Sequence, residues 1–127
     1  MPVTSLTSVK IRPVDAATVT DALKKWAEKL RSNNSAIKAV GYFGSYAKKT
    51  FAPGSDLDVI IVLEESPFPR FFDRIPDLYP QSFPVGVDIF AYTVEEINKM
   101  KSRKNSWIEH ILDETIWVLP LPAGLLS

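Results

Sequence analysis

The residues best suited to chemistry in this chain are Gly44-Ser45 and, after ten intervening residues, Asp56 and Asp58. The two aspartates open an apolar run at 57–63, where carboxylates are costly unless a cation lies opposite them. Side chains at i and i+2 of a strand point to the same face, with Cα atoms about 6.5 Å apart, so both carboxylates can converge on a hard ion such as Mg2+. Gly44 allows the backbone to approach a phosphate closely, and Ser45 offers it a hydroxyl and an N–H. The pattern predicts a metal site beside a phosphate site.

A third aspartate, Asp88, lies inside another apolar run at 85–91. If this run forms a strand beside the strand at 57–63, the three aspartates form one cluster. Clustered carboxylates repel one another and raise each other's pKa, so such a cluster is expected mainly where it binds cations. Two ions roughly 3.5–4 Å apart can clamp the attacking and leaving oxygens of a phosphoryl displacement. We expect Asp58 to bridge two Mg2+ ions with Asp56 beside it, and Asp88 to complete the second ion's shell and accept the proton of an attacking hydroxyl.

Simpler interpretations of these acids exist. Asp56 and Asp58 could cap a turn, because Asp is common after Pro-Gly. Asp88 could pair with a buried Arg or Lys, as buried acids often do. The spacing from Gly44-Ser45 favours the metal site over both. The single histidine, His110, is predicted to be a surface or partly buried helix residue and not a catalyst.

Length and composition limit the possible classes of protein. The 127 residues support a single domain, 1–127, with a core at about 14–119, and 46% hydrophobic with 24% charged residues is typical of soluble globular proteins. Lys plus Arg equals Asp plus Glu at 15 each, so no overall field favours nucleic acid or membrane. The absence of cysteine excludes disulfides, thiolate metal sites and cysteine nucleophiles. No apolar run approaches transmembrane length, and we expect a cytoplasmic protein.

The elements that must position these residues follow from hydrophobic periodicity. It predicts an α/β (α+β) fold, with a small mixed β-sheet flanked by helices. Helices are expected at about 19–30, 46–50, 69–79 and 93–100 and after Ser106, which is expected to cap the last of them; strands are expected at 39–43, 57–63, 85–91 and 116–119, with a possible edge strand at 9–11.

Local signals add three expectations. Asp15 or Thr18 can cap the first helix, and Thr93 carries the cap-and-acid signature of a helix start. The aromatic residues among the prolines of 66–84 could be core or could leave an apolar patch for a partner or for self-association. We expect core with some partner-facing surface.

The glycine, serine and three aspartates, in this order and spacing, resemble the nucleotidyltransferase superfamily related to DNA polymerase beta. Gly-Ser-Tyr-Ala-Lys at 44–48, the segment 87–96 and the closing helix and strand at 107–119 are similar to its small stand-alone members, the minimal nucleotidyltransferases. The resemblance covers about residues 14–119. It implies that the chain is a transferase that uses a nucleoside triphosphate, with ATP as the expected donor of AMP, and releases pyrophosphate.

The resemblance also implies roles for single residues. Gly44 and Ser45 would hold the triphosphate, and Lys48, at the basic position of the motif, would be a third nucleotide-binding residue. Asp56 and Asp58 would bind Mg2+, and Asp88 would be the third carboxylate. Lys49 departs from the pattern because the family usually has glycine there, so we expect a less sharp turn and weaker nucleotide binding.

A protein partner is implied in the same way. Minimal nucleotidyltransferases are often encoded beside an all-helical HEPN protein, and the pair acts as a toxin–antitoxin system in which the nucleotidyltransferase neutralises the HEPN ribonuclease by transferring AMP to it or by binding. One alternative is therefore a non-catalytic antitoxin or adaptor that acts by occlusion. Another is a nucleotidyltransferase for a small molecule such as an antibiotic. Template-directed polymerisation is not expected, because the chain offers no basic face to hold a duplex.

Overall fold

A four-stranded mixed sheet organises the structure, a computed structural model that describes residues 15–52 and 54–126. The possible edge strand at 9–11 lies outside the described residues. The strands follow the order β3-β2-β1-β4, where β1 is Ile37–Phe43, β2 is Leu57–Leu63, β3 is Val87–Thr93 and β4 is Ile116–Leu119. β1 runs antiparallel to β2 and to β4, whereas β2 and β3 are parallel. The expected small mixed sheet flanked by helices is thus confirmed.

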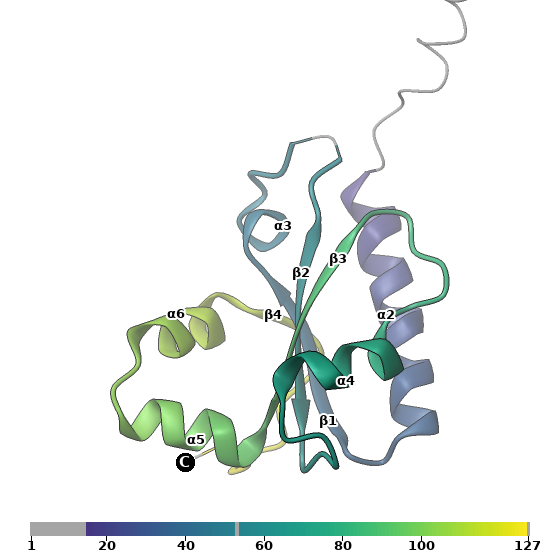
Figure 1. The fold of residues 1–127 in the computed structure, drawn as a ribbon. Helices are drawn as coiled ribbons and strands as arrows, with labels where there is room; N and C mark the ends of the chain where they lie inside the picture. The colour runs from purple at the N-terminus through teal and green to yellow at the C-terminus, as the bar shows by residue number, and fades with distance from the viewer. Residues whose placement is uncertain (1–14, 53, 127) are drawn as a thin grey trace, which may run out of the picture.

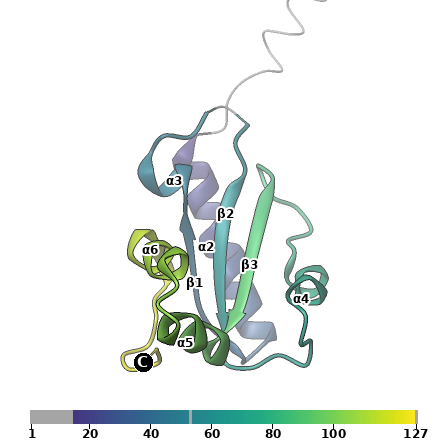
Figure 2. The ribbon, with the colours of Figure 1, turned by 60° about the vertical axis from the view of Figure 1, so that its left-hand side comes forward.

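Helices cover both faces of this sheet (Figures 1 and 2). The helices are α2 (Ala16–Asn33), α3 (Ser45–Lys48), α4 (Phe71–Leu78), α5 (Val94–Ser102) and α6 (Ser106–Glu114). α2 lies on one face, and α5 and α6 lie on the other, while α4 runs beside β3 (Figure 2). None of the helices in the described part of the chain has the length and apolar composition of a membrane span.

Two apolar clusters hold the helices on the sheet. On the α2 face, Val19 and Leu23 are fully buried, and the Trp26 Nε1–H donates to the Leu78 carbonyl of α4 at 3.1 Å. On the other face, Ile97 of α5 and Ile108 of α6 are fully buried against the sheet. The central strands contribute to both clusters because their side chains alternate between the faces.

Most helix starts follow from the sequence, and one expectation was wrong. Asp15 caps α2 by accepting a 2.8 Å hydrogen bond from the Thr18 N–H, and Thr93 forms the capping box of α5. α6 is capped by Asn105 and not by Ser106, because the Asn105 side-chain oxygen accepts from the N–H groups of Trp107 and Ile108. β3 also begins two residues later than expected, at Val87.

The aromatic residues of the proline-rich segment are less buried than expected. Phe72 is 77% exposed, and Phe68 and Tyr79 are exposed as well, so the expectation that these side chains are mainly core is wrong for them. Phe71 is half-buried and stacks edge-on against Phe72 at 5.2 Å between ring centroids. The part of this group that faces solvent is therefore larger than the part that faces the core.

Candidate active site

The turn after β1 depends on a glycine for two separate reasons. Gly44 has φ 74° and ψ −147°, a conformation that is essentially restricted to glycine. A Cβ atom at this position would also collide with Oδ2 of Asp58. α3 begins at the next residue, Ser45, which is half-exposed. Any side chain at position 44 would therefore disturb both the turn and the carboxylate beneath it.

The register of the two parallel strands brings the aspartates to one end of the sheet. Asp58 of β2 pairs with Asp88 of β3, and neighbouring strands lie about 4.8 Å apart. Asp56 precedes β2, and a Cβ atom on Gly86 would collide with Oδ1 of Asp56. α3 and the starts of β2 and β3 lie at the same end of the sheet (Figure 1). The structure thus places the three acids beside the Gly44 turn.

The electrostatics of this end are unbalanced. Burial raises the pKa of Asp58, and the carboxylates of Asp88, Asp56 and Glu114 raise it further. Asp56 and Asp88 are exposed, and among residues 15–52 and 54–126 no ion pair involves any of the three aspartates. Among the described side chains, no group of three or more acids or histidines is arranged so that it could hold a metal ion. The site therefore consists of oxygen donors whose mutual repulsion a cation would relieve.

The alternative interpretation of Asp88 as the partner of a buried cation is wrong. The buried Arg74 is committed elsewhere: it binds Glu96 through contacts of 2.6 and 2.9 Å and donates to the Ala91 carbonyl at 3.0 Å. Asp88 is exposed because β3 is an outer strand of the described sheet and Asp88 is only its second residue. Its carboxylate therefore stays solvated, and the cost expected for an unpaired acid inside a strand does not arise.

Lys49, the residue at the usual glycine position, keeps the turn sharp. It ends α3 in the left-handed conformation, with φ 61° and ψ 34°. The turn is closed by hydrogen bonds from the Lys48 N–H to the Gly44 carbonyl at 3.0 Å and from the Thr50 N–H to the Ser45 carbonyl at 2.9 Å. The expectation of a looser turn is therefore wrong. A lysine adopts the glycine conformation here at a local energetic cost.

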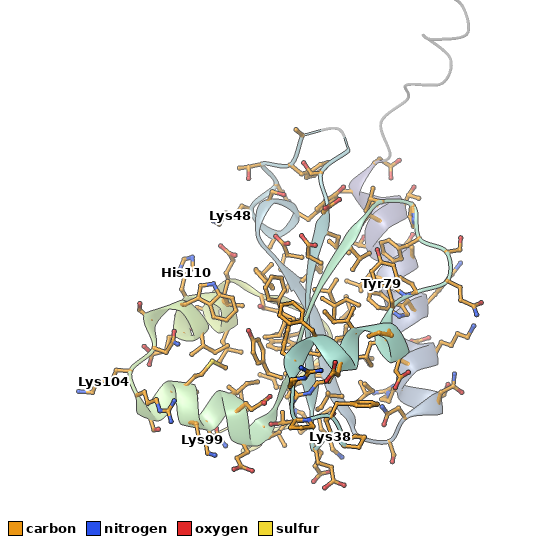
Figure 3. All side chains as sticks on the ribbon, viewed as in Figure 1. Lys38, Lys48, Tyr79, Lys99, Lys104 and His110 are labelled. Carbon is orange, nitrogen blue, oxygen red and sulfur yellow. The ribbon has the colours of Figure 1, made fainter. Side chains whose placement is uncertain are left out.

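A fourth carboxylate, Glu114, was missed by the sequence reasoning. The Gly44 N–H donates to Oε2 of Glu114 at 2.8 Å, and Nζ of Lys48 lies 3.1 Å from Oε1. Nε2 of His110 lies 3.6 Å from the same Oε1, and Figure 3 shows Lys48 and His110 on the same side of the molecule. The hydrogen bond from Gly44, followed by that from Lys48, lowers the pKa of Glu114.

One signal could have drawn attention to Glu114. It is the last residue of α6, and an acid at the carboxyl end of a helix opposes the helix dipole. Residues that break a local rule are often placed for function. Its partner Gly44 is 70 residues away in the chain, so the contact itself could not be predicted.

Comparison with known proteins supports the fold and gives a family. The family model described as a nucleotidyltransferase domain matches residues 23–118. A solved structure of a candidate nucleotidyltransferase from Sulfolobus solfataricus is similar with a TM-score of 0.56, 18% identity and 80% of each chain covered. A chain from a toxin–antitoxin crystal structure with AMP-PNP has a TM-score of 0.47 and 15% identity, over 75% of this chain and 71% of that one, a likeness too slight to carry an argument. No curated protein matches this chain.

Proposed function

This chain belongs to the nucleotidyltransferase domain family, and from that premise we propose that it transfers AMP from ATP to a hydroxyl group in a Mg2+-dependent reaction. One observation carries the proposal. Asp58 and Asp88 lie in register on parallel strands beside the Gly44-Ser45 turn, and no cation of the described chain pairs with them. Unpaired carboxylates next to a tight glycine turn are what a metal-bound triphosphate requires.

The carboxylate oxygens of this cluster are the type of donor that a hard divalent cation prefers. Asp56, Asp58 and Asp88 would hold Mg2+, since each offers carboxylate oxygens; the pKa of Asp58 is raised by burial and, after that, by repulsion from Asp88 and Asp56. When bound, Mg2+ supplies charge neutralisation of the triphosphate and polarisation of the reacting phosphate. Gly44 and Gly86 leave the space that the carboxylates of Asp58 and Asp56 occupy.

The protein residues would then orient the substrates and manage the proton. Ser45 would hydrogen-bond the phosphates through its hydroxyl. The acceptor hydroxyl oxygen forms a bond to the α-phosphorus as the bond from that phosphorus to the oxygen bridging the β-phosphorus breaks, so pyrophosphate leaves. Asp88, exposed at the sheet edge, would take the hydroxyl proton.

We propose a protein as the acceptor, because aromatic side chains extend from Asp88 along one face of β3. Phe90 and Tyr92 follow Asp88 at two-residue steps, and the Trp107 ring lies 6.0 and 6.1 Å from them between centroids. Trp107 is 41% exposed. Exposed apolar patches of this kind are typical of protein contact sites. A HEPN-type protein, the partner that the resemblance to minimal nucleotidyltransferases implies, is the first acceptor to test.

Labelling with ATP tests the proposal directly. The chain is incubated with ATP labelled at the α-phosphate, Mg2+ and a HEPN protein, and label on the HEPN protein is measured. We expect transfer in the wild type and a loss of more than about 10^3-fold when Asp56→Asn and Asp58→Asn are combined, because the metal site is removed. Asp21→Asn, an exposed acid on α2, is the matched control and should label normally.

The same experiment separates the alternatives. Label retained in the double variant would overturn the assignment of the carboxylates. Tight binding of the HEPN protein without label, unchanged in the double variant, would support an antitoxin that acts by occlusion. Label that appears only on an added small-molecule alcohol would point to an antibiotic-type transferase.

A further inference from the structure

Glu114 connects the end of α6 to the turn that carries Ser45. Its two carboxylate oxygens have different partners: Oε2 accepts from the Gly44 N–H at 2.8 Å, and Oε1 pairs with Nζ of Lys48 at 3.1 Å. These two contacts form the Glu114 link. They join the two ends of the segment 44–48. A carboxylate with partners at both ends of a turn fixes the orientation of that turn as well as its position.

The backbone around Glu114 is itself well anchored. The next residue, Thr115, is buried, and its N–H and hydroxyl both donate to the Ile111 carbonyl, at 2.9 and 2.6 Å. Ile116 then pairs with Tyr42 in the sheet, two residues before Gly44. The Glu114 side chain is only 11% exposed. Glu114 therefore reaches the turn from a rigid support.

The turn has two attachments to the rest of the described fold: the Glu114 link, and Tyr46, which is buried in the core and whose hydroxyl donates to the Ser55 carbonyl at 3.1 Å. α3 has four residues, and helices this short are not stable alone. Its internal hydrogen bonds, from Lys48 and Thr50 to the carbonyls of Gly44 and Ser45, fix its shape but not its position relative to Asp58.

The Glu114 link also changes the roles that the resemblance implied for Gly44 and Lys48. Gly44 and Lys48 were both expected to bind the nucleotide, yet the Gly44 N–H and the Lys48 ammonium already have an anionic partner in Glu114. Ser45 lies between them in the turn. The contacts favour a division in which Ser45 meets the phosphate while Gly44 and Lys48 hold the turn.

We propose that Glu114 is a positioning residue for the nucleotide site: it holds the 44–48 turn so that Ser45 faces the phosphates, and Lys48 acts through Glu114 instead of binding the nucleotide directly. This inference rests on the proposed function, because it requires that the turn binds a triphosphate. It adds a residue from the end of α6 to a site otherwise built from β1, β2 and β3.

A double-mutant cycle on Mg2+-ATP binding tests this inference. The variants are Glu114→Gln, Lys48→Met and both together, with Glu109→Ala on the exposed surface of α6 as control. The dissociation constant for ATP is measured by calorimetry in the full chain. We expect each single change to weaken binding about 5- to 30-fold, as for loss of a charge-assisted hydrogen bond, and the control to bind as the wild type does.

The decisive result is the double variant. If Lys48 acts through Glu114, the double variant binds ATP as weakly as the weaker single variant, because the link is already broken. If the two losses multiply, Lys48 contacts the nucleotide independently and the inference is wrong. The inference also fails if Glu114→Gln binds ATP normally. Since Lys48 is 54% exposed, its replacement leaves the fold intact even if Glu114 variants are less stable.

The wild-type titration separates failure of this inference from failure of the proposed function. Absence of Mg2+-ATP binding by the wild type would overturn the proposed function itself. Normal wild-type binding with additive losses would leave the proposed function standing and overturn only the role of Glu114. Glu114→Asp keeps the charge on a shorter side chain, and we expect it to restore part of the affinity lost in Glu114→Gln.

Discussion

Acidic side chains have opposite surroundings at the two ends of β3. At its amino end, Asp58 and Asp88 lie together, and no cation of the described chain pairs with them. At its carboxyl end, the buried Arg74 donates two hydrogen bonds to Glu96. It also donates to the backbone carbonyls of Ala91 and Phe68. The contrast teaches that this chain can supply a counter-charge where the fold needs one. Its absence at the other end is therefore a property of the site and not a defect of packing.

The largest effect is expected when a carboxylate is removed at the amino end of β3, where the acids have no cationic partner within the described chain. Asp58→Asn should reduce AMP transfer by more than about 10^3-fold while leaving the thermal midpoint unchanged or higher, because repulsion is removed together with the metal ligand. Transfer assays and thermal melts of the same preparation check this. A variant that melts well below the wild type would show that Asp58 supports the fold, which would remove the distinction between the two ends.

The next test removes the counter-charge at the balanced end. Arg74→Met should lower the free energy of unfolding by about 2–3 kcal/mol, because four hydrogen bonds to buried or half-buried acceptors are lost. The value is kept small because Glu96 is partly exposed, so water weakens its ion pair with Arg74. Urea melts measure this change. Transfer activity per folded molecule should stay within about threefold of the wild type, since Arg74 contacts the other end of the strand.

Asp58 at the amino end of β3 and Glu96 near its carboxyl end should make the free energy of unfolding depend on pH with opposite signs. The pKa of Asp58 is raised above 3.8, so the folded state binds the Asp58 proton more tightly than the unfolded chain does. The free energy of unfolding therefore falls as the pH rises from 3.8 through the folded pKa of Asp58. Hydrogen bonds from Arg74 lower the pKa of Glu96 below 4.5, so its contribution is present above 4.5 and is lost as the pH falls through its folded pKa.

Urea melts of three proteins between about pH 3 and pH 7 check these signs. Asp58→Asn should gain stability relative to the wild type as the pH rises. Glu96→Gln should lose less stability than the wild type on acidification. Parallel curves for all three proteins would contradict both assignments.

The smallest test concerns the strained residue beside the unbalanced end. Lys49→Gly should raise the free energy of unfolding by about 0.5–1 kcal/mol, because glycine adopts the left-handed conformation without the steric cost that lysine bears. ATP affinity should change little, since the turn already has its glycine-like shape. An unstable Lys49→Gly variant would show that the lysine side chain contributes more than its backbone conformation costs.

Much of the fold and of the candidate site could be predicted from local sequence signals. The run 57–63 and the run containing Asp88 are apolar enough to indicate strands, and the α+β order follows from their spacing. The predicted bounds were less accurate. β1 begins at Ile37, earlier than expected. Asn105 and not Ser106 caps α6, and the sequence did not distinguish them because both residue types are good caps.

What could not be predicted depends on tertiary contacts. The exposure of Asp88 follows from the position of β3 at the side of the sheet, which no local pattern encodes. The pairing of Arg74 with Glu96 joins residues 22 apart, and that of Gly44 with Glu114 joins residues 70 apart. A single sequence offers many acids and bases at such separations, and only packing selects the pairs that meet.

The distance along the chain between Gly44 and Glu114 has a consequence for protein synthesis. β1 leaves the ribosome early, but its neighbour β4 and the carboxylate at the end of α6 are among the last described parts to be made. Because chains emerge from the amino end, the 44–48 turn lacks the Glu114 link until synthesis has passed residue 114. A nascent chain that already contains all three aspartates would thus still lack this contact between α6 and the turn.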